Sequence, residues 1–110
     1  MPLNFVERGM STSPTELRAA LAQRVSVTDD ALTVDLLDGR TVSVPLSWYP
    51  RLAHATSAER ANWRLIGRGE GIHWPDLDED ISVAGLLAGW PSGEGQSSLR
   101  RWLESRQGAR

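Results

Sequence analysis

His73 and the acidic residues at 76–80 are the side chains in this sequence best suited to carry out chemistry. An imidazole close to carboxylates can take up and release a proton, so His73 with Asp76 or Asp78 could serve as a general acid–base pair. No serine lies in an elbow or strained turn nearby for such a pair to activate. We therefore expect no catalytic residue, and we interpret His73 as a structural or surface histidine.

The acidic run also suggests a calcium-binding loop, because Asp76, Asp78 and Asp80 alternate as ligands do in such loops. The remaining positions do not fit: Ile81 stands where the loop requires glycine, and Leu87 where it requires a bidentate glutamate. We expect no metal site there. We interpret the run as a solvated acidic turn before a helix, whose positive end favours carboxylates.

Zinc and nucleotide sites are not expected either. His54 and His73 are the only histidines and the sequence has no cysteine, so a zinc ion would lack ligands at suitable spacing. The glycine-rich segment 67–71 matches neither nucleotide-binding pattern, because no lysine–serine pair follows and no capped helix begins directly after it. A hairpin turn explains the segment better, and we expect no cofactor.

Tryptophan, tyrosine and arginine next to one another are frequent in protein interfaces. The sequence has five tryptophans, and segments 48–51 (WYPR) and 63–64 (WR) could form one exposed patch. The alternative is that these rings fill the core, which their large apolar area favours. The candidate interaction surface comprises Trp48, Tyr49, Arg51, Trp63, Arg64, His73, Trp74, Asp76, Asp78 and Trp102.

The composition of the 110 residues is that of one globular domain, with 40% hydrophobic and 24% charged residues. A net charge of −2 disfavours overall attraction to nucleic acid.

No apolar run could span a bilayer, and residues 1–9 lack the features of a signal peptide, so we expect a cytoplasmic protein without membrane contact. Either Met1 or Met10 could be the true start.

The first element predicted along the chain is a helix. Ser13, Pro14 and Glu16 form a helix start with a capping box, and the helix would run to about Gln23. A strand near 25–27 follows it.

Apolar residues alternate over 32–36 and 42–46 on either side of Asp38-Gly39, the favoured two-residue hairpin turn, in which both central residues need a positive φ. Pro45 cannot donate to a ladder, so the second of these strands is an edge or ends there.

Short helices are predicted from their caps. Ser47 would cap a helix through residue 52, and Thr56 with Glu59 forms a capping box for a helix over about 58–62. A second hairpin spans 64–75 through the glycine-rich turn. Beyond it, Ser82 would cap a last core helix that Gly89 ends.

The tail, residues 96–106, is an amphipathic helix candidate with Leu99, Trp102 and Leu103 on one face. A short isolated helix is marginal in water, so this face should dock on the domain or on a partner. We divide the chain into an N-terminal extension with a short helix (1–23), a core domain (24–90), and a Gly/Ser linker with the tail helix (91–110). The predicted fold class is α+β: a small antiparallel sheet, with hairpins near 25–46 and 64–75, packed with short helices.

Residues 25–89 resemble the bacterial family known as domain of unknown function 2442. The similarity is carried by segments 28–32, 37–40, 44–52, 60–67 and 71–83. The resemblance implies a small α+β domain with an antiparallel sheet and packed helices, without an established activity or catalytic residues to transfer. Some members resemble antitoxin-like halves of two-gene modules. Others carry a helix-turn-helix, which this chain lacks.

Three functions follow as hypotheses. The first is a non-enzymatic protein-interaction or regulatory module, in its most specific form an antitoxin-like one, that binds the product of an adjacent gene or a second copy of itself. The second is a nucleic-acid-binding transcriptional regulator that uses Arg100, Arg101, Arg106 and Arg110. The third is a small hydrolase-type enzyme that uses His73 and Asp76.

Overall fold

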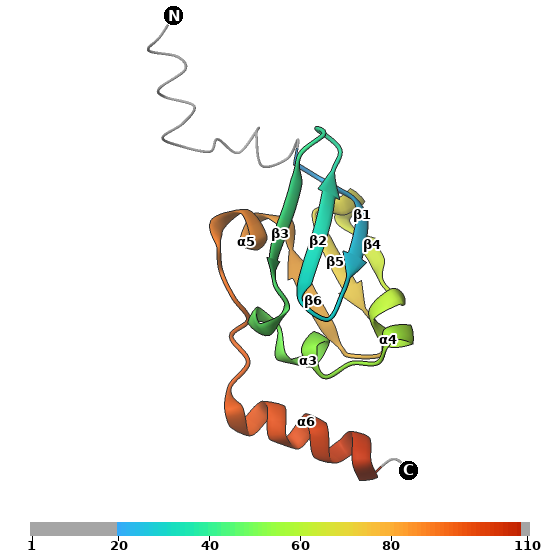
Figure 1. Ribbon diagram of the computed structural model, residues 1–110, viewed down its shortest axis with the longest axis vertical. Helices are drawn as coiled ribbons and strands as arrows, with labels where there is room; N and C mark the ends of the chain where they lie inside the picture. Colours follow the sequence, from blue (N-terminus) through green and yellow to red (C-terminus); the bar gives the residue numbers. More distant parts are fainter. Residues whose placement is uncertain (1–19, 109–110) are drawn as a thin grey trace, which may run out of the picture.

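The computed structural model describes residues 20–108, whose strands form two antiparallel three-stranded sheets (Figure 1). The predicted α+β class is confirmed. The first sheet has the order β1-β2-β3 and the second the order β4-β5-β6. The strands are β1 (Ala22–Val27), β2 (Ala31–Leu36), β3 (Thr41–Pro45), β4 (Arg64–Ile66), β5 (Gly71–Trp74) and β6 (Glu79–Ser82).

Short helices connect the strands, and one longer helix closes the described chain. Helices α3 and α4 lie at one end of the domain. Figure 1 shows α6 beyond that end, after an extended connection from α5. The helices are the 3-10 helices η1 (Leu46–Trp48) and η2 (Gly67–Gly69), and the α-helices α3 (Pro50–Ala53), α4 (Ser57–Ala61), α5 (Val83–Ala88) and α6 (Gln96–Gly108).

Both sheets contribute to one apolar core. Strand β2 alternates as predicted, and its inward residues Leu32, Val34 and Leu36 are all buried. They belong to the same cluster as Ile72 and Trp74 of β5. The indole N–H of Trp74 donates to the carbonyl of residue 60 at 3.1 Å, so this ring is a satisfied core residue and its assignment to an interaction surface is wrong.

The turn at Asp38-Gly39 is in the predicted place but has a different geometry. Leu36 pairs with Arg40, with the N–H of Leu36 bonded to the carbonyl of Arg40 at 2.8 Å, so the loop contains three residues. Gly39 has φ +96°, whereas Asp38 does not have a positive φ. In such a loop only the glycine must be left-handed. The Asp38 carboxylate instead accepts hydrogen bonds from the backbone and side chain of Arg40.

Two predicted helix boundaries are wrong. Ala22 and Gln23 belong to β1, where Ala22 pairs with Leu36, so no helix extends to Gln23. Ala20 and Leu21 are not helical either, and residues 13–19 of that predicted helix lie outside the described residues. Ser47 does not cap a helix, because a 3-10 turn ends at Trp48 and α3 starts after Tyr49 without a side-chain cap.

The caps predicted for α4 and α5 are confirmed, whereas the capping box predicted at Ser13 and Glu16 lies outside the described residues. Thr56 and Glu59 form the complete capping box of α4. The hydroxyl of Ser82 accepts a hydrogen bond from the N–H of Gly85 at 2.9 Å, and Gly89 ends α5 in the left-handed conformation.

Strand β6 was missed, because the acidic run was interpreted as a solvated turn up to the helix. The turn includes Asp78, with φ +51°, but Glu79 already pairs with Trp74. Buried Ile81 lies opposite buried Ile72. The packing of this one side chain in the core thus stabilises a strand, although the residues around it are polar.

Candidate functional site

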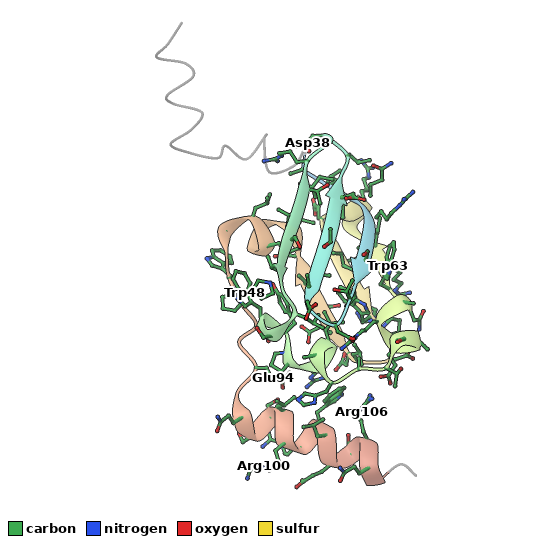
Figure 2. The ribbon with its side chains drawn as sticks, in the orientation of Figure 1. Asp38, Trp48, Trp63, Glu94, Arg100 and Arg106 are labelled. Atoms are coloured by element: carbon green, nitrogen blue, oxygen red, sulfur yellow. The ribbon has the colours of Figure 1, made fainter. Side chains whose placement is uncertain are left out.

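The tryptophans predicted to form one patch lie far apart. Figure 2 shows Trp48 on the β3 side of the domain and Trp63, just before β4, on the opposite side. Both rings are half-buried and pack against the core. Tyr49 is buried, and its hydroxyl donates to the carbonyl of Trp90 at 3.2 Å. The prediction of a shared Trp48–Trp63 surface is therefore wrong, because the two sheets separate the segments.

Arg51 and Trp102 do come together, where the tail meets the domain. The guanidinium of Arg51 lies over the Trp102 ring, 5.3 Å from its centroid. Its Nε donates to Glu94 at 2.7 Å, and its Nη1 donates to the carbonyl of Leu77 at 2.9 Å. The tail helix thus docks on its own domain, which is one of the two alternatives that its apolar face left open.

Arg106 completes this contact from α6. Its guanidinium lies 4.6 Å from the centroid of Trp102 and donates to both carboxylate oxygens of Glu59 at 2.9 Å. Figure 2 shows Arg106 between α6 and the domain and Arg100 on the outer side of α6. We call the set Arg51, Glu59, Glu94, Trp102 and Arg106 the tail clamp.

Glu59 has two roles in the tail clamp. Its carboxylate accepts from the N–H of Thr56 at 2.8 Å, which completes the cap of α4, and it also binds Arg106. The hydrogen bonds from Arg106, followed by those from Thr56, lower the pKa of Glu59 to about 2. Because α4 has no buried residue, its position depends on such polar contacts.

His73 does not pair with Asp76. The Nδ1 atom of His73 lies 2.5 Å from Asp80 of the neighbouring strand, the residue opposite it in the register. Asp76 instead accepts a hydrogen bond from Asn62 at 3.0 Å. The acid–base pair proposed for the third hypothesis is therefore not formed.

The remaining sequence candidates do not add to a site. Asp78 is exposed in the turn before β6, and Arg64 is exposed on β4, opposite His73 in the register. Within residues 20–108, no three histidine or acidic side chains are grouped so that they could hold a metal ion.

A groove along β1 was not predicted from the sequence. It is lined by Val25, Ser26, Val27, Thr28, Asp29, Ser57, Arg60, Ala61 and Trp63. Its volume is about 550 Å³, within the range of ligand sites in proteins. Three residues of β1, Val25 to Val27, line it together with the two turn residues that follow them, so a strand edge and the adjoining turn form one wall. We call it the β1 groove.

The ladder shows which backbone groups of β1 point into the β1 groove. The N–H of Thr28 bonds to the carbonyl of Ala31, so these residues form a hydrogen-bonded pair. Hydrogen-bonded pairs alternate along an antiparallel ladder. The backbone N–H and C=O groups of Ser26, which lies opposite Thr33, therefore also point toward β2. The backbone N–H and C=O groups of Val25 and Val27 point away from β2. Among the strands that the structure describes, β1 is at the edge of its sheet.

The opposite wall of the β1 groove is α4 with Trp63. Arg60 fixes this wall to the domain, since its guanidinium donates to the carbonyls of Leu52 at 2.9 Å and Ala53 at 3.0 Å and to Asp29 at 2.7 Å. The wall is thus held in place, with a space between it and the strand. The alternation at 25–27 could predict the strand, but its status as an edge depends on sheet order, which local sequence does not specify.

In residues 20–108, the fold and the groove define a small α+β domain in which the outer edge of β1 pairs with no other strand. The chain belongs to the family described as protein of unknown function (DUF2442), whose model matches residues 22–92. No curated protein matches it. No helix within residues 20–108 has the length and apolar character needed to cross a membrane.

Two solved structures share the fold. One is the crystal structure of a protein of unknown function from Rhodospirillum rubrum, with 27% identity and a TM-score of 0.58, covering 73% of this chain and 96% of that one. The other is the solution NMR structure of an uncharacterised protein from Chromobacterium violaceum, with 18% identity and a TM-score of 0.57, covering 82% of this chain and 76% of that one. At the lower identity the likeness concerns the fold alone.

Proposed function

We propose that this protein is a non-enzymatic protein-interaction module that binds an extended segment of a partner as an additional strand beside β1. The observation that carries the proposal is the set of outward N–H and C=O groups of Val25 and Val27 on the β1 groove. An unpaired strand edge is a template for another chain, and adding a strand to such an edge is a recurring mode of peptide recognition.

The groove favours a single peptide strand over a second folded domain. A partner strand would form about four backbone hydrogen bonds with Val25 and Val27, each with a net contribution of roughly 1 kcal/mol. Its side chains would alternate between the two faces, and Trp63 offers one of them an apolar wall. Residues of α4 line the other side of the groove, so a single strand needs less space there than a second copy of the whole sheet.

The adjacent-gene product is the partner we propose, in the manner of an antitoxin-like half of a two-gene module acting in the cytoplasm. The test is hydrogen exchange of the full chain, alone and co-purified with that product. Slower exchange at the Val25 and Val27 amides in the complex would support strand addition. Protection confined to other elements would refute it.

A matched pair of variants sharpens this test. Val27→Pro removes an N–H that faces the groove, and Ser43→Pro removes one that faces outward from β3 at the other edge of the same sheet. Proline is tolerated on edge strands, so both variants should fold. We expect Val27→Pro to weaken partner binding at least tenfold and Ser43→Pro to leave it unchanged. Equal binding by both variants would overturn the proposal.

Nucleic-acid binding has less support as an alternative. Arg106 is occupied by Glu59, which leaves Arg100 and Arg101 as the exposed arginines of the proposed cluster within the described residues; Arg110 lies outside them. A regulator of that kind would bind promoter DNA with an affinity that falls steeply with salt concentration.

A further inference from the structure

A second groove lies along β6, the edge strand of the other sheet. It has a volume of about 240 Å³ and forms where β6 meets the connection from α5 to α6. We call it the Glu79 groove. It is lined by Tyr49, Glu79, Asp80, Ile81, Ser82, Gly85, Trp90, Pro91, Ser92 and Gly93.

Glu79 points toward the interior of the domain at this groove. Side chains alternate along a strand, so Glu79 lies on the same face as buried Ile81, whereas Asp80 and Ser82 lie on the exposed face. Half-buried carboxylates normally have a partner. Within residues 20–108, no hydrogen bond or ion pair holds the Glu79 carboxylate, although Arg51 of α3 is near enough to interact with its charge.

Trp90 supplies an exposed aromatic ring to the same groove. Its side chain is 66% exposed, although it is one of the largest apolar groups in the chain. Its backbone is fixed, because its N–H bonds to the carbonyl of Gly85 at 2.9 Å and its carbonyl accepts from the Tyr49 hydroxyl at 3.2 Å. The ring is therefore presented to solvent by an ordered segment.

We propose that the Glu79 groove binds the guanidinium of an arginine side chain presented by a partner protein. A carboxylate that accepts no hydrogen bond from the described residues can accept two parallel N–H bonds from a guanidinium. An exposed indole ring offers the face on which such a cation stacks. The surrounding charge is complementary, because Asp78, Asp80 and Glu94 lie near Glu79. This groove is separate from the β1 groove, and the inference stands independently of strand addition.

Proton uptake by Glu79 should compete with the arginine. Burial raises the pKa of Glu79 to about 7, with Arg51 opposing the shift and Glu94, Asp80 and Asp78 adding to it. The ionised form, which the guanidinium needs, is then about tenfold more abundant at pH 8 than at pH 6. Burial raises the pKa of Tyr49 above its usual value, so its hydroxyl remains neutral over this pH range.

The test is an NMR titration of the ¹⁵N-labelled full chain with Nα-acetyl-arginine methylamide at pH 8. We expect shifts of the Trp90 indole N–H and of the Ser92 and Gly93 amides, and none with the uncharged citrulline analogue. Affinity should fall about tenfold at pH 6. Equal shifts with citrulline, equal affinity for the lysine analogue, or shifts confined to other elements would overturn the proposal.

Two variants with the same change in net charge complete the experiment. Glu79→Gln should lower the affinity for arginine at least tenfold at pH 8 and remove its pH dependence, because a neutral amide replaces the carboxylate. Asp30→Asn changes an exposed carboxylate in the turn before β2, outside the Glu79 groove, and should bind arginine as the unmodified chain does. Unchanged affinity in Glu79→Gln, or an equal loss in Asp30→Asn, would contradict a specific role for Glu79.

Discussion

Glu59 and Arg106 join the tail helix to the N-terminal cap of α4 through two hydrogen bonds of 2.9 Å. The two residues lie far apart in sequence, yet the same carboxylate completes the capping box with Thr56. Because α4 is one wall of the β1 groove, the tail clamp connects the C-terminal helix to the surface that we propose binds a peptide.

Replacing Glu59 by glutamine should loosen both the tail and α4. We expect a loss of about 1 kcal/mol in the free energy of unfolding, the upper end for ion pairs that remain partly in contact with water, and faster hydrogen exchange at the α4 amides. Glu104→Gln is the control, because Glu104 is exposed on α6. If exchange in α4 were the same in both variants, Glu59 would not couple the two elements.

The tail should also detach in acid. The hydrogen bonds from Arg106 hold the pKa of Glu59 at about 2, below its ordinary value of 4.5. A carboxyl group whose pKa is lowered by folding contributes stability above its unfolded pKa and loses that contribution as the pH falls toward the folded value. We therefore expect the Trp102 indole resonance to change between about pH 4.5 and 2. The change should be smaller in Glu59→Gln, where Glu94, whose pKa is also lowered, is the remaining carboxylate of the tail clamp.

Local sequence patterns specified the parts of this fold that depend on neighbours in the chain. The strand pattern at 32–36 and the Thr56–Glu59 capping box were predicted correctly because each depends on residues a few positions apart. Strand β6 was missed because Ile81 is its only fully buried position, too little for a periodic signal.

The candidate sites depend on contacts that no local pattern contains. The Trp102 face was predicted to dock, but its partners Arg51 and Arg106 come from different elements. The open edge of β1 follows from the sheet order. The inward position of Glu79 could have been inferred from its spacing to Ile81, had the strand been recognised.

Glu79→Gln should stabilise the protein at alkaline pH. Burial raises the pKa of Glu79 from 4.5 to about 7, so the folded state holds a proton that the unfolded state releases, and the stability of the unmodified chain falls as the pH rises through this window. We expect the variant to gain about 1 kcal/mol in unfolding free energy at pH 8, a fraction of the full linkage because Glu79 is partly exposed, and little at pH 4.

Glu94→Gln is the matched comparison, and it should lower the unfolding free energy at pH 8, where Glu79→Gln should raise it. Hydrogen bonds from Arg51 and then from Ser98 lower the pKa of Glu94, so its charged form stabilises the fold at pH 8. Denaturant unfolding at pH 8 and pH 4 measures both variants. A destabilised Glu79→Gln at pH 8 would mean that this carboxylate already has a stabilising partner within the chain.

Gly69 and Gly39 should respond differently to alanine, although both have a left-handed backbone, with φ +102° and +96°. A Cβ atom on Gly69 would lie 2.6 Å from the carbonyl oxygen of Ala22 at the start of β1, whereas a Cβ on Gly39 would meet no atom within 4 Å. Gly39→Ala should therefore cost only the backbone strain, roughly 1 kcal/mol. Gly69→Ala should cost at least about twice as much, because the backbone of η2 or β1 must move. Equal unfolding free energies for the two variants would show that η2 does not pack closely against β1.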